Sequence, residues 1–132
     1  MLLLGGVQAC AGAQGDAPED TGQAEPVEET VGTASYYADR FDGKPTSTGE
    51  TYYQDSLTAA SKDLAYNTVV RVTNTDNGRS VRVRINDCGP HHPERIIDLS
   101  GAAARRIGLV ESGTATVRLR VLEPGADGPT CQ

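Results

Sequence analysis

Residues 69–85 decide the fold of this chain, and they read VVRVTNTDNGRSVRVRI. Apolar and polar side chains alternate on both sides of the central residues 74–78. A period of two is typical of strands that bury one face. Asn77 and Gly78 tolerate the positive φ that a tight hairpin turn requires. The stretch therefore predicts two strands joined by a hairpin.

Further short elements lie on either side of this hairpin. Residues 117–121 show the same alternation and predict another strand. Ser100 is suited to cap a short helix over 101–107, which would end at Gly108. Weaker strand candidates are 32–37, 57–60 and 96–99. Five or six strands with one or two short helices favour a small closed barrel, because closure removes exposed edges.

The charge distribution predicts where the domain lies in the 132 residues. All 12 basic residues and 11 of the 18 acidic ones fall in 31–123. Residues 11–30 hold six acidic residues and no basic residue, a composition that cannot build a core. We therefore expect a folded domain at 31–123, a disordered acidic linker at 11–30 and a tail at 124–132.

Charge and apolar patterning exclude two classes of protein. The net charge is −6, and a nucleic-acid-binding protein normally has a basic face. No apolar run approaches the roughly 18 residues of a membrane-spanning helix. The sequence therefore argues against a nucleic-acid-binding protein and against an integral membrane protein.

His91 and His92 are adjacent, so an extended backbone directs them to opposite sides, and we expect no shared metal. A monomer without a cofactor is the expectation.

The first ten residues, MLLLGGVQAC, form a short apolar stretch that ends at Cys10. The stretch resembles a truncated lipoprotein signal peptide, in which Cys10 would be lipidated and would anchor the protein to a membrane. A flexible linker after Cys10 suits a tether. The alternative is a disordered apolar segment with an incidental cysteine.

Lipidation of Cys10 would leave Cys88 and Cys131 as an even pair in an oxidising compartment. A bridge between them would hold the C-terminal tail against the domain. Two unpaired thiols are the alternative.

Residues from about Gly32 to Leu122 resemble the rare lipoprotein A (RlpA) family. Seven segments carry the resemblance, namely GTASYY (32–37), FDGKPTSTGE (41–50), LTAA (57–60), VVRVTN (69–74), NGR (77–79), VRINDCGP (83–90) and RIIDLSGAAA (95–104). Ser61 stands in place of the family's histidine, and Cys88 stands in place of an arginine. The resemblance implies a mainly β fold, a six-stranded double-psi β-barrel with one or two short helices.

The same resemblance implies an endolytic peptidoglycan lytic transglycosylase of the bacterial cell envelope, which cleaves glycan strands to 1,6-anhydromuramyl ends. Asp87 would act as the acid and base, and Glu50 would assist it in the same groove. Predicted substrate-binding residues are Ser61, Tyr37 and Arg95. The alternative function is an expansin-like peptidoglycan-binding module without catalysis, which the loss of the family histidine at Ser61 favours.

Several of these residues also have a plain structural interpretation. Asp87 suits the cap of a turn, and Glu50 suits a solvated loop. We interpret Asp98 as mainly structural, accepting hydrogen bonds from backbone amides near the helix start, with a catalytic role as the alternative. His91 or His92 is a candidate to replace the missing histidine.

Overall fold

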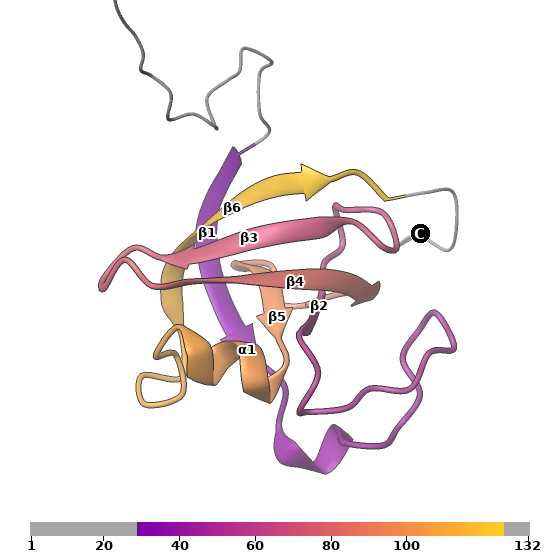
Figure 1. The fold of residues 1–132 in the computed structure, drawn as a ribbon. Coiled ribbons are helices and arrows are strands. Elements are labelled where there is room, and N and C mark those ends of the chain that lie inside the picture. Colours follow the sequence, from indigo (N-terminus) through magenta and orange to yellow (C-terminus); the bar gives the residue numbers. More distant parts are fainter. Residues whose placement is uncertain (1–28, 126–132) are drawn as a thin grey trace, which may run out of the picture.

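The structure is a computed structural model and describes residues 29–125 (Figure 1). In chain order its elements are β1 (Glu29–Tyr36), a 3₁₀ helix (Asp39–Phe41), β2 (Thr58–Ala60), β3 (Val69–Asn74), β4 (Ser80–Asp87), β5 (Arg95–Leu99), α1 (Gly101–Arg106) and β6 (Ala115–Glu123). The six strands and the short α-helix confirm the mainly β fold expected from the sequence. None of the helices within 29–125 has the length and apolar character needed to cross a membrane.

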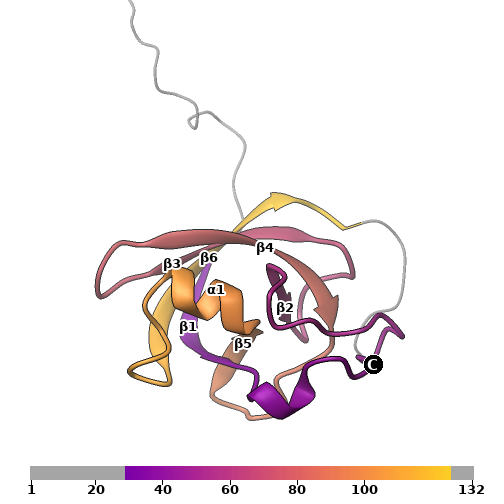
Figure 2. The same ribbon diagram turned by 60° about the horizontal axis from the view of Figure 1, so that its bottom comes forward.

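The six strands close into a barrel in the order β1-β5-β2-β4-β3-β6. β6 closes the barrel by pairing antiparallel with β1. Two pairs, β1 with β5 and β2 with β4, are parallel, and the others are antiparallel. Within residues 29–125, closure leaves no long unpaired edge, as the short alternating strands predicted. Figures 1 and 2 show the strands wrapping around a common interior.

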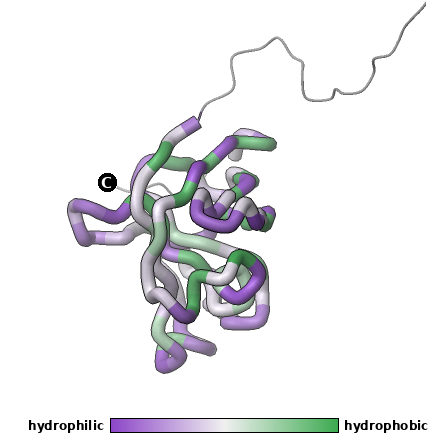
Figure 3. The backbone as a smooth tube through the Cα atoms, turned by 90° about the vertical axis from the view of Figure 1, so that its left-hand side faces the viewer, coloured by the Kyte–Doolittle hydropathy of each residue, from purple (hydrophilic) through white to green (hydrophobic). Residues whose placement is uncertain are grey.

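The alternating side chains of the hairpin fill this interior. Val70 pairs with Val83, and Val72 pairs with Val81, across β3 and β4. All four are at most 6% exposed, while the intervening arginines lie on the outside. The alternation of hydrophobic and hydrophilic residues is visible along the tube in Figure 3. Gly78 has a φ of 77°, as the predicted tight turn requires.

α1 covers one end of the barrel (Figure 2). Ala103, Ala104 and Ile107 are fully buried and belong to the same core as the strands. Ser100 caps the helix as predicted, because its Oγ accepts a hydrogen bond from the N–H of Ala103 at 3.2 Å. The helix ends at Arg106, one residue before the predicted end.

β1 begins at Glu29, two residues before the predicted start of the domain at 31. Glu29 pairs with Arg120 and Thr30 pairs with Leu119, so pairing with β6 outweighs the acidic composition that suggested a linker here. Residues 1–28 and 126–132 lie outside the described residues. The linker over 11–28, the lipidation of Cys10 and the bridge to Cys131 therefore stay predictions.

Candidate functional site

A groove of about 610 Å³ opens beside the ends of β1, β4 and β5. Three of the predicted site residues, Asp87, Tyr37 and Arg95, line it. The segment that follows the 3₁₀ helix forms another part of the wall and contributes Ser47. The groove is therefore assembled from parts of the chain that are far apart in sequence.

A β-bulge directs Asp87 into this groove. β2 pairs with β4 as Ala59 with Ile85 and then Ala60 with Asp87, so Asn86 is an extra residue on β4. If side chains alternated regularly along β4, Asp87 would lie on the same face as Ile85, a core residue that is 1% exposed. The extra residue reverses the alternation, and Asp87 and Ala60 both line the groove.

The Asp87 carboxylate accepts four hydrogen bonds. Its Oδ1 accepts from the N–H of Ser47 at 2.9 Å, the hydroxyl of Ser47 at 2.7 Å and the N–H of Cys88 at 2.8 Å. Its Oδ2 accepts from the hydroxyl of Tyr37. Burial acts to raise the pKa of Asp87, but these hydrogen bonds outweigh it and hold the pKa below its ordinary value. The carboxyl group is therefore ionised at neutral pH in the free protein.

Tyr37 is held as a proton donor to Asp87. Its ring stacks on Tyr52 with the centroids 4.2 Å apart. Tyr52 is 2% exposed, and its hydroxyl accepts a hydrogen bond from the N–H of Gly101 at 3.1 Å. Burial, followed by the hydrogen bond to Asp87, raises the pKa of Tyr37. Its hydroxyl consequently keeps its proton at neutral pH.

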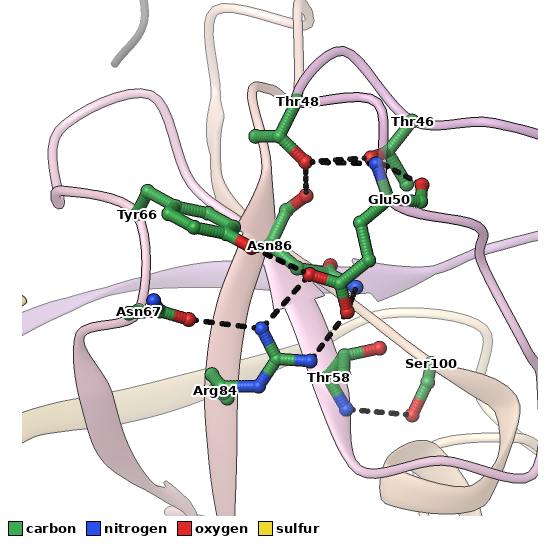
Figure 4. Close-up of polar contacts among 9 residues, drawn as sticks. All are labelled: Thr46, Thr48, Glu50, Thr58, Tyr66, Asn67, Arg84, Asn86 and Ser100. Atoms are coloured by element: carbon green, nitrogen blue, oxygen red, sulfur yellow. Dashed lines mark hydrogen bonds and ion pairs between the residues drawn. The ribbon is translucent and has the colours of Figure 1, made fainter. Parts of the chain in front are cut away.

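Glu50 lines a second cavity, of about 250 Å³, and not the groove with Asp87. Figure 4 shows the polar contacts of Glu50. Arg84 donates to both of its carboxylate oxygens, with Nη1 3.0 Å from Oε1. Tyr66 and Asn86 donate as well, at 2.9 and 3.2 Å. The hydrogen bond from Arg84 is the main reason that the pKa of Glu50 falls to about 2, against the opposing effect of burial.

The structure does not bring the Ser61 side chain into the groove. Ser61 is 2% exposed, and its hydroxyl accepts hydrogen bonds from the N–H groups of Asp63 and Leu64, both at 3.1 Å. The side chain lines a small cavity of about 40 Å³. Ser61 is linked to Asp87 through the backbone, because its N–H donates to the carbonyl of Asp87 at 3.1 Å.

Asp98 is a second carboxylate in the groove. Its Oδ1 accepts a hydrogen bond from the hydroxyl of Ser35 and lies 3.6 Å from Nε of Arg95. The contacts of Asp98 are thus with side chains of the groove and not with the backbone amides of α1, which Ser100 caps instead. Arg95, predicted to contact substrate, is held beside the carboxylate.

The fold and these residues agree with a known family. Residues 29–119 match the family model described as "Lytic transglycolase", a double-psi β-barrel family. The chain belongs to this family. The resemblance to RlpA proteins expected from the sequence segments is confirmed as well.

Two relatives of this chain illustrate the match. The protein of Neisseria meningitidis serogroup A named endolytic peptidoglycan transglycosylase RlpA is 50% identical over 102 residues, which are 77% of this chain and 43% of that protein. The protein of the same name from Pseudomonas aeruginosa (strain UCBPP-PA14) is 52% identical over 94 residues, 71% of this chain and 28% of that one. The chain thus spans less than half the length of either relative.

Among solved structures, the barrel is similar to an expansin of Clavibacter michiganensis. The TM-score is 0.58 at 20% sequence identity, and the match covers 76% of this chain and 53% of the expansin. At this identity the similarity concerns the fold alone, and it confirms the β-barrel expected from the sequence.

Sequence reasoning missed two features of this candidate site. Ser47 supplies two of the hydrogen bonds to Asp87, although only its place in the 41–50 segment marked it. The hydrogen bond of Tyr37 to Asp87 joins residues 50 positions apart, so no local pattern signals it.

His91 and His92 also line the groove. Within 29–125 no group of three or more His, Cys, Asp or Glu side chains is placed to hold a metal.

Proposed function

We propose that the protein is an endolytic peptidoglycan lytic transglycosylase with Asp87 as its acid and base. The observation that carries the proposal is the position of Asp87, which a β-bulge directs into a 610 Å³ groove. The names of relatives that share half of the matched residues support the same activity. The glycan strand would lie in the groove.

In the proposed reaction, protonated Asp87 gives its proton to the glycosidic oxygen as the bond from that oxygen to C1 of the muramyl residue breaks. The resulting carboxylate then takes the proton of the C6 hydroxyl, whose oxygen bonds to C1. The product is a 1,6-anhydro end, and no water is consumed. One carboxyl group therefore serves as acid first and as base second.

The surrounding residues would tune this proton transfer. Burial is the factor that acts to raise the pKa of Asp87. A bound glycan strand would cover the groove further and favour the protonated acid. Tyr37 would hold Oδ2, and Arg95 would contact the substrate. Glu50 would assist from its own cavity by fixing Asn86, the neighbour of Asp87, through the hydrogen bond from Nδ2.

The second candidate function is a wall-binding module without catalysis. The observation that favours it is the set of four hydrogen bonds that hold the Asp87 carboxylate in its ionised form. The family resemblance, which places a histidine at the position of Ser61, points the same way, since the Ser61 side chain lies outside the groove. The glycan-binding groove would be the same in both cases.

A peptidoglycan substrate supports a place in the bacterial cell envelope, facing the periplasm or the cell wall. We propose the lipid anchor on Cys10 on sequence grounds alone. We also propose the bridge between Cys88 and Cys131, which the disulfide-bonded state of Cys88 supports.

Digestion of purified glycan strands tests the proposal, with mass spectrometry of anhydro-ended products as the measurement. Asp87→Asn keeps the shape of the side chain but removes the transferable proton, so product release should fall at least about 100-fold. Asp76→Asn makes the same change at the exposed hairpin turn and should leave the rate unaltered. Equal rates for the wild type and Asp87→Asn would exclude Asp87 as the acid. Strand binding without any product from the wild type would favour the binding module.

A further inference from the structure

The outer surface of the barrel carries four arginines on three neighbouring strands, β4, β3 and β6, which Figure 1 shows side by side. Arg71 on β3 pairs with Arg82 on β4 and with Arg120 on β6, so these three form one row across the sheet. Arg118 lies two residues before Arg120 on β6 and therefore points to the same side of the sheet. We call these four residues the arginine face.

The arginine face is separate from the candidate functional site. Arg71, Arg82 and Arg118 are exposed, and Arg120 is half-buried. None of the four lines the groove or the second cavity. Arg84, the next outward residue of β4, differs from them because it lines the second cavity. The proposed mechanism therefore makes no use of the arginine face.

The row is an unfavourable arrangement for the isolated domain. Residues directly opposite one another in antiparallel strands have Cβ atoms about 4.5–5.5 Å apart, and like charges at such positions are destabilising. Arg82 forms an ion pair with Glu123 at 3.5 Å, whereas the other three arginines form no ion pair within residues 29–125. Glu29 is the acidic residue that strand register places opposite Arg120. The face keeps an excess of positive charge that an anionic partner would neutralise.

The chemistry of the face indicates a phosphate-bearing surface as this partner. A guanidinium group donates paired hydrogen bonds to phosphate, and four of them lie side by side on an open strand surface. Val31, which pairs with Arg118 from β1 and is 57% exposed, adds an apolar side chain beside them. Cationic groups next to exposed apolar surface are typical of proteins that lie on anionic membranes.

The point at which the chain enters the barrel favours the same partner. Glu29, the first described residue, pairs with Arg120 at one end of the row. Residues 11–28 separate Glu29 from Cys10, the residue proposed to carry a lipid. A random chain of this length would span roughly 20–25 Å. An anchor on Cys10 would thus hold the barrel near the membrane by the rim of the arginine face.

We propose that the arginine face docks the barrel on an anionic phospholipid surface. Its guanidinium groups would donate hydrogen bonds to headgroup phosphates, and Val31 would contact the interface beside them. Such a contact is weak by itself, and the anchor on Cys10 would supply the second attachment that stable membrane binding requires. The inference goes beyond the proposed function, because it concerns neither glycan binding nor cleavage.

Vesicle binding tests the arginine face on the full chain with Cys10→Ser, which leaves the proposed anchor out. This protein should cosediment at low salt with vesicles of equal parts phosphatidylglycerol and phosphatidylcholine, and less so as salt is added. Arg71→Gln with Arg120→Gln should weaken this binding roughly 5- to 25-fold, since each arginine near an anionic membrane contributes about fivefold. Equal binding to vesicles of phosphatidylcholine alone would overturn the inference.

Arg105→Gln with Arg106→Gln is the matched control. It removes the same two charges from α1, which covers one end of the barrel, and it should leave vesicle binding unchanged. The melting temperature of the Arg71→Gln and Arg120→Gln protein should be unchanged or higher, because like charges are removed from the row. Equal weakening by both pairs of substitutions would show that net charge alone decides binding and would contradict the proposal.

The same proteins distinguish two other anionic partners. If the Arg71→Gln and Arg120→Gln protein loses binding to purified peptidoglycan but not to vesicles, the face binds the carboxylates of the wall peptides. If vesicle binding appears only after deletion of 11–28, the acidic segment itself occupies the face. Either result would overturn docking on the membrane. Anhydro product release from free glycan strands is measured separately, so failure of this inference would leave the proposed function standing.

Discussion

At the residue scale, the chemistry depends on the protonation state of Asp87. Hydrogen bonds from Tyr37, Ser47 and Cys88 stabilise its carboxylate, and they hold it in one orientation within the groove. The backbone N–H of Ser61 donates a hydrogen bond to the backbone carbonyl of Asp87. The hydroxyl of Ser61 instead accepts hydrogen bonds within the turn at 61–64. The free protein therefore presents a fixed anion that must gain a proton before it is able to act as an acid.

The pH dependence of glycan cleavage follows from this state. Because the pKa of Asp87 is lowered, the protonated fraction grows as the pH falls from 7 towards 4. If the free protein must carry this proton, kcat/KM for strand cleavage should rise by up to about tenfold per pH unit. Anhydro product release measured between pH 7 and 4 checks this, with Asp76→Asn expected to follow the wild type. A flat profile would contradict the role of Asp87 as the acid.

At the element scale, the ion pair between Glu50 and Arg84 fastens the turn over 46–50 to β4. Tyr66 adds a hydrogen bond from the segment before β3, so three parts of the chain meet at one carboxylate (Figure 4). The β-bulge at Asn86 lies beside this junction. The ion pair thus supports the end of β4 that bears Asp87.

Acid unfolding tests the contribution of Glu50. Its pKa is about 2 in the folded protein against an ordinary value of 4.5, so its stabilising effect is full above about pH 4.5 and is lost as the pH falls to 2. Glu50→Gln should lower the free energy of unfolding at pH 7 by about 1–3 kcal/mol. Glu50→Gln should also flatten the pH dependence of the free energy of unfolding between pH 5 and pH 2.

Glu123→Gln is the matched control for this experiment. Glu123 pairs with Arg82 at 3.5 Å, and both side chains are more than half exposed. Removal of such a surface pair should change the free energy of unfolding by less than about 1 kcal/mol. Chemical denaturation of the three proteins at several pH values provides the comparison, and equal losses for both variants would contradict the role of Glu50.

At the scale of the whole molecule, closure of the barrel depends on its first and last strands. β1 pairs with β6 from Glu29 to Ala34, and β6 continues to pair with β3. The first two residues of β1 lie in the stretch whose acidic composition suggested a linker. The paired barrel therefore includes Glu29 and Thr30.

Truncation tests this boundary. Deletion of 11–28 should leave the melting temperature within about 2 °C, because the composition of that segment predicts no buried core. Deletion of 11–30 removes the pairs that Glu29 and Thr30 form with β6. Deletion of 11–30 should therefore lower the melting temperature more than deletion of 11–28 does. The expected decrease is about 4–8 °C for each kcal/mol lost from the free energy of unfolding. Thermal unfolding of the two truncated proteins decides between 29 and 31 as the start of the domain.

The amino-acid sequence by itself determined the strands, the capped helix and the family. The alternating residues of β3, β4 and β6 require one buried and one exposed face, and Ser100 is a local cap, so each of these features depends on near neighbours. The segment around Asp87 was also recognisable from local sequence. Acidic composition assigned Glu29 and Thr30 to the linker, whereas both pair with β6, because strand pairing does not depend on local composition.

Only the tertiary structure decided how the site residues are grouped. The bulge at Asn86 depends on pairing with β2, and it directs Asp87 into the groove. Tyr37 contacts Asp87 across 50 positions, whereas Glu50 contacts Arg84 in a separate cavity. The physical reason is that the direction of a side chain at a strand end depends on the register of its partner strand, which closure of the barrel fixes.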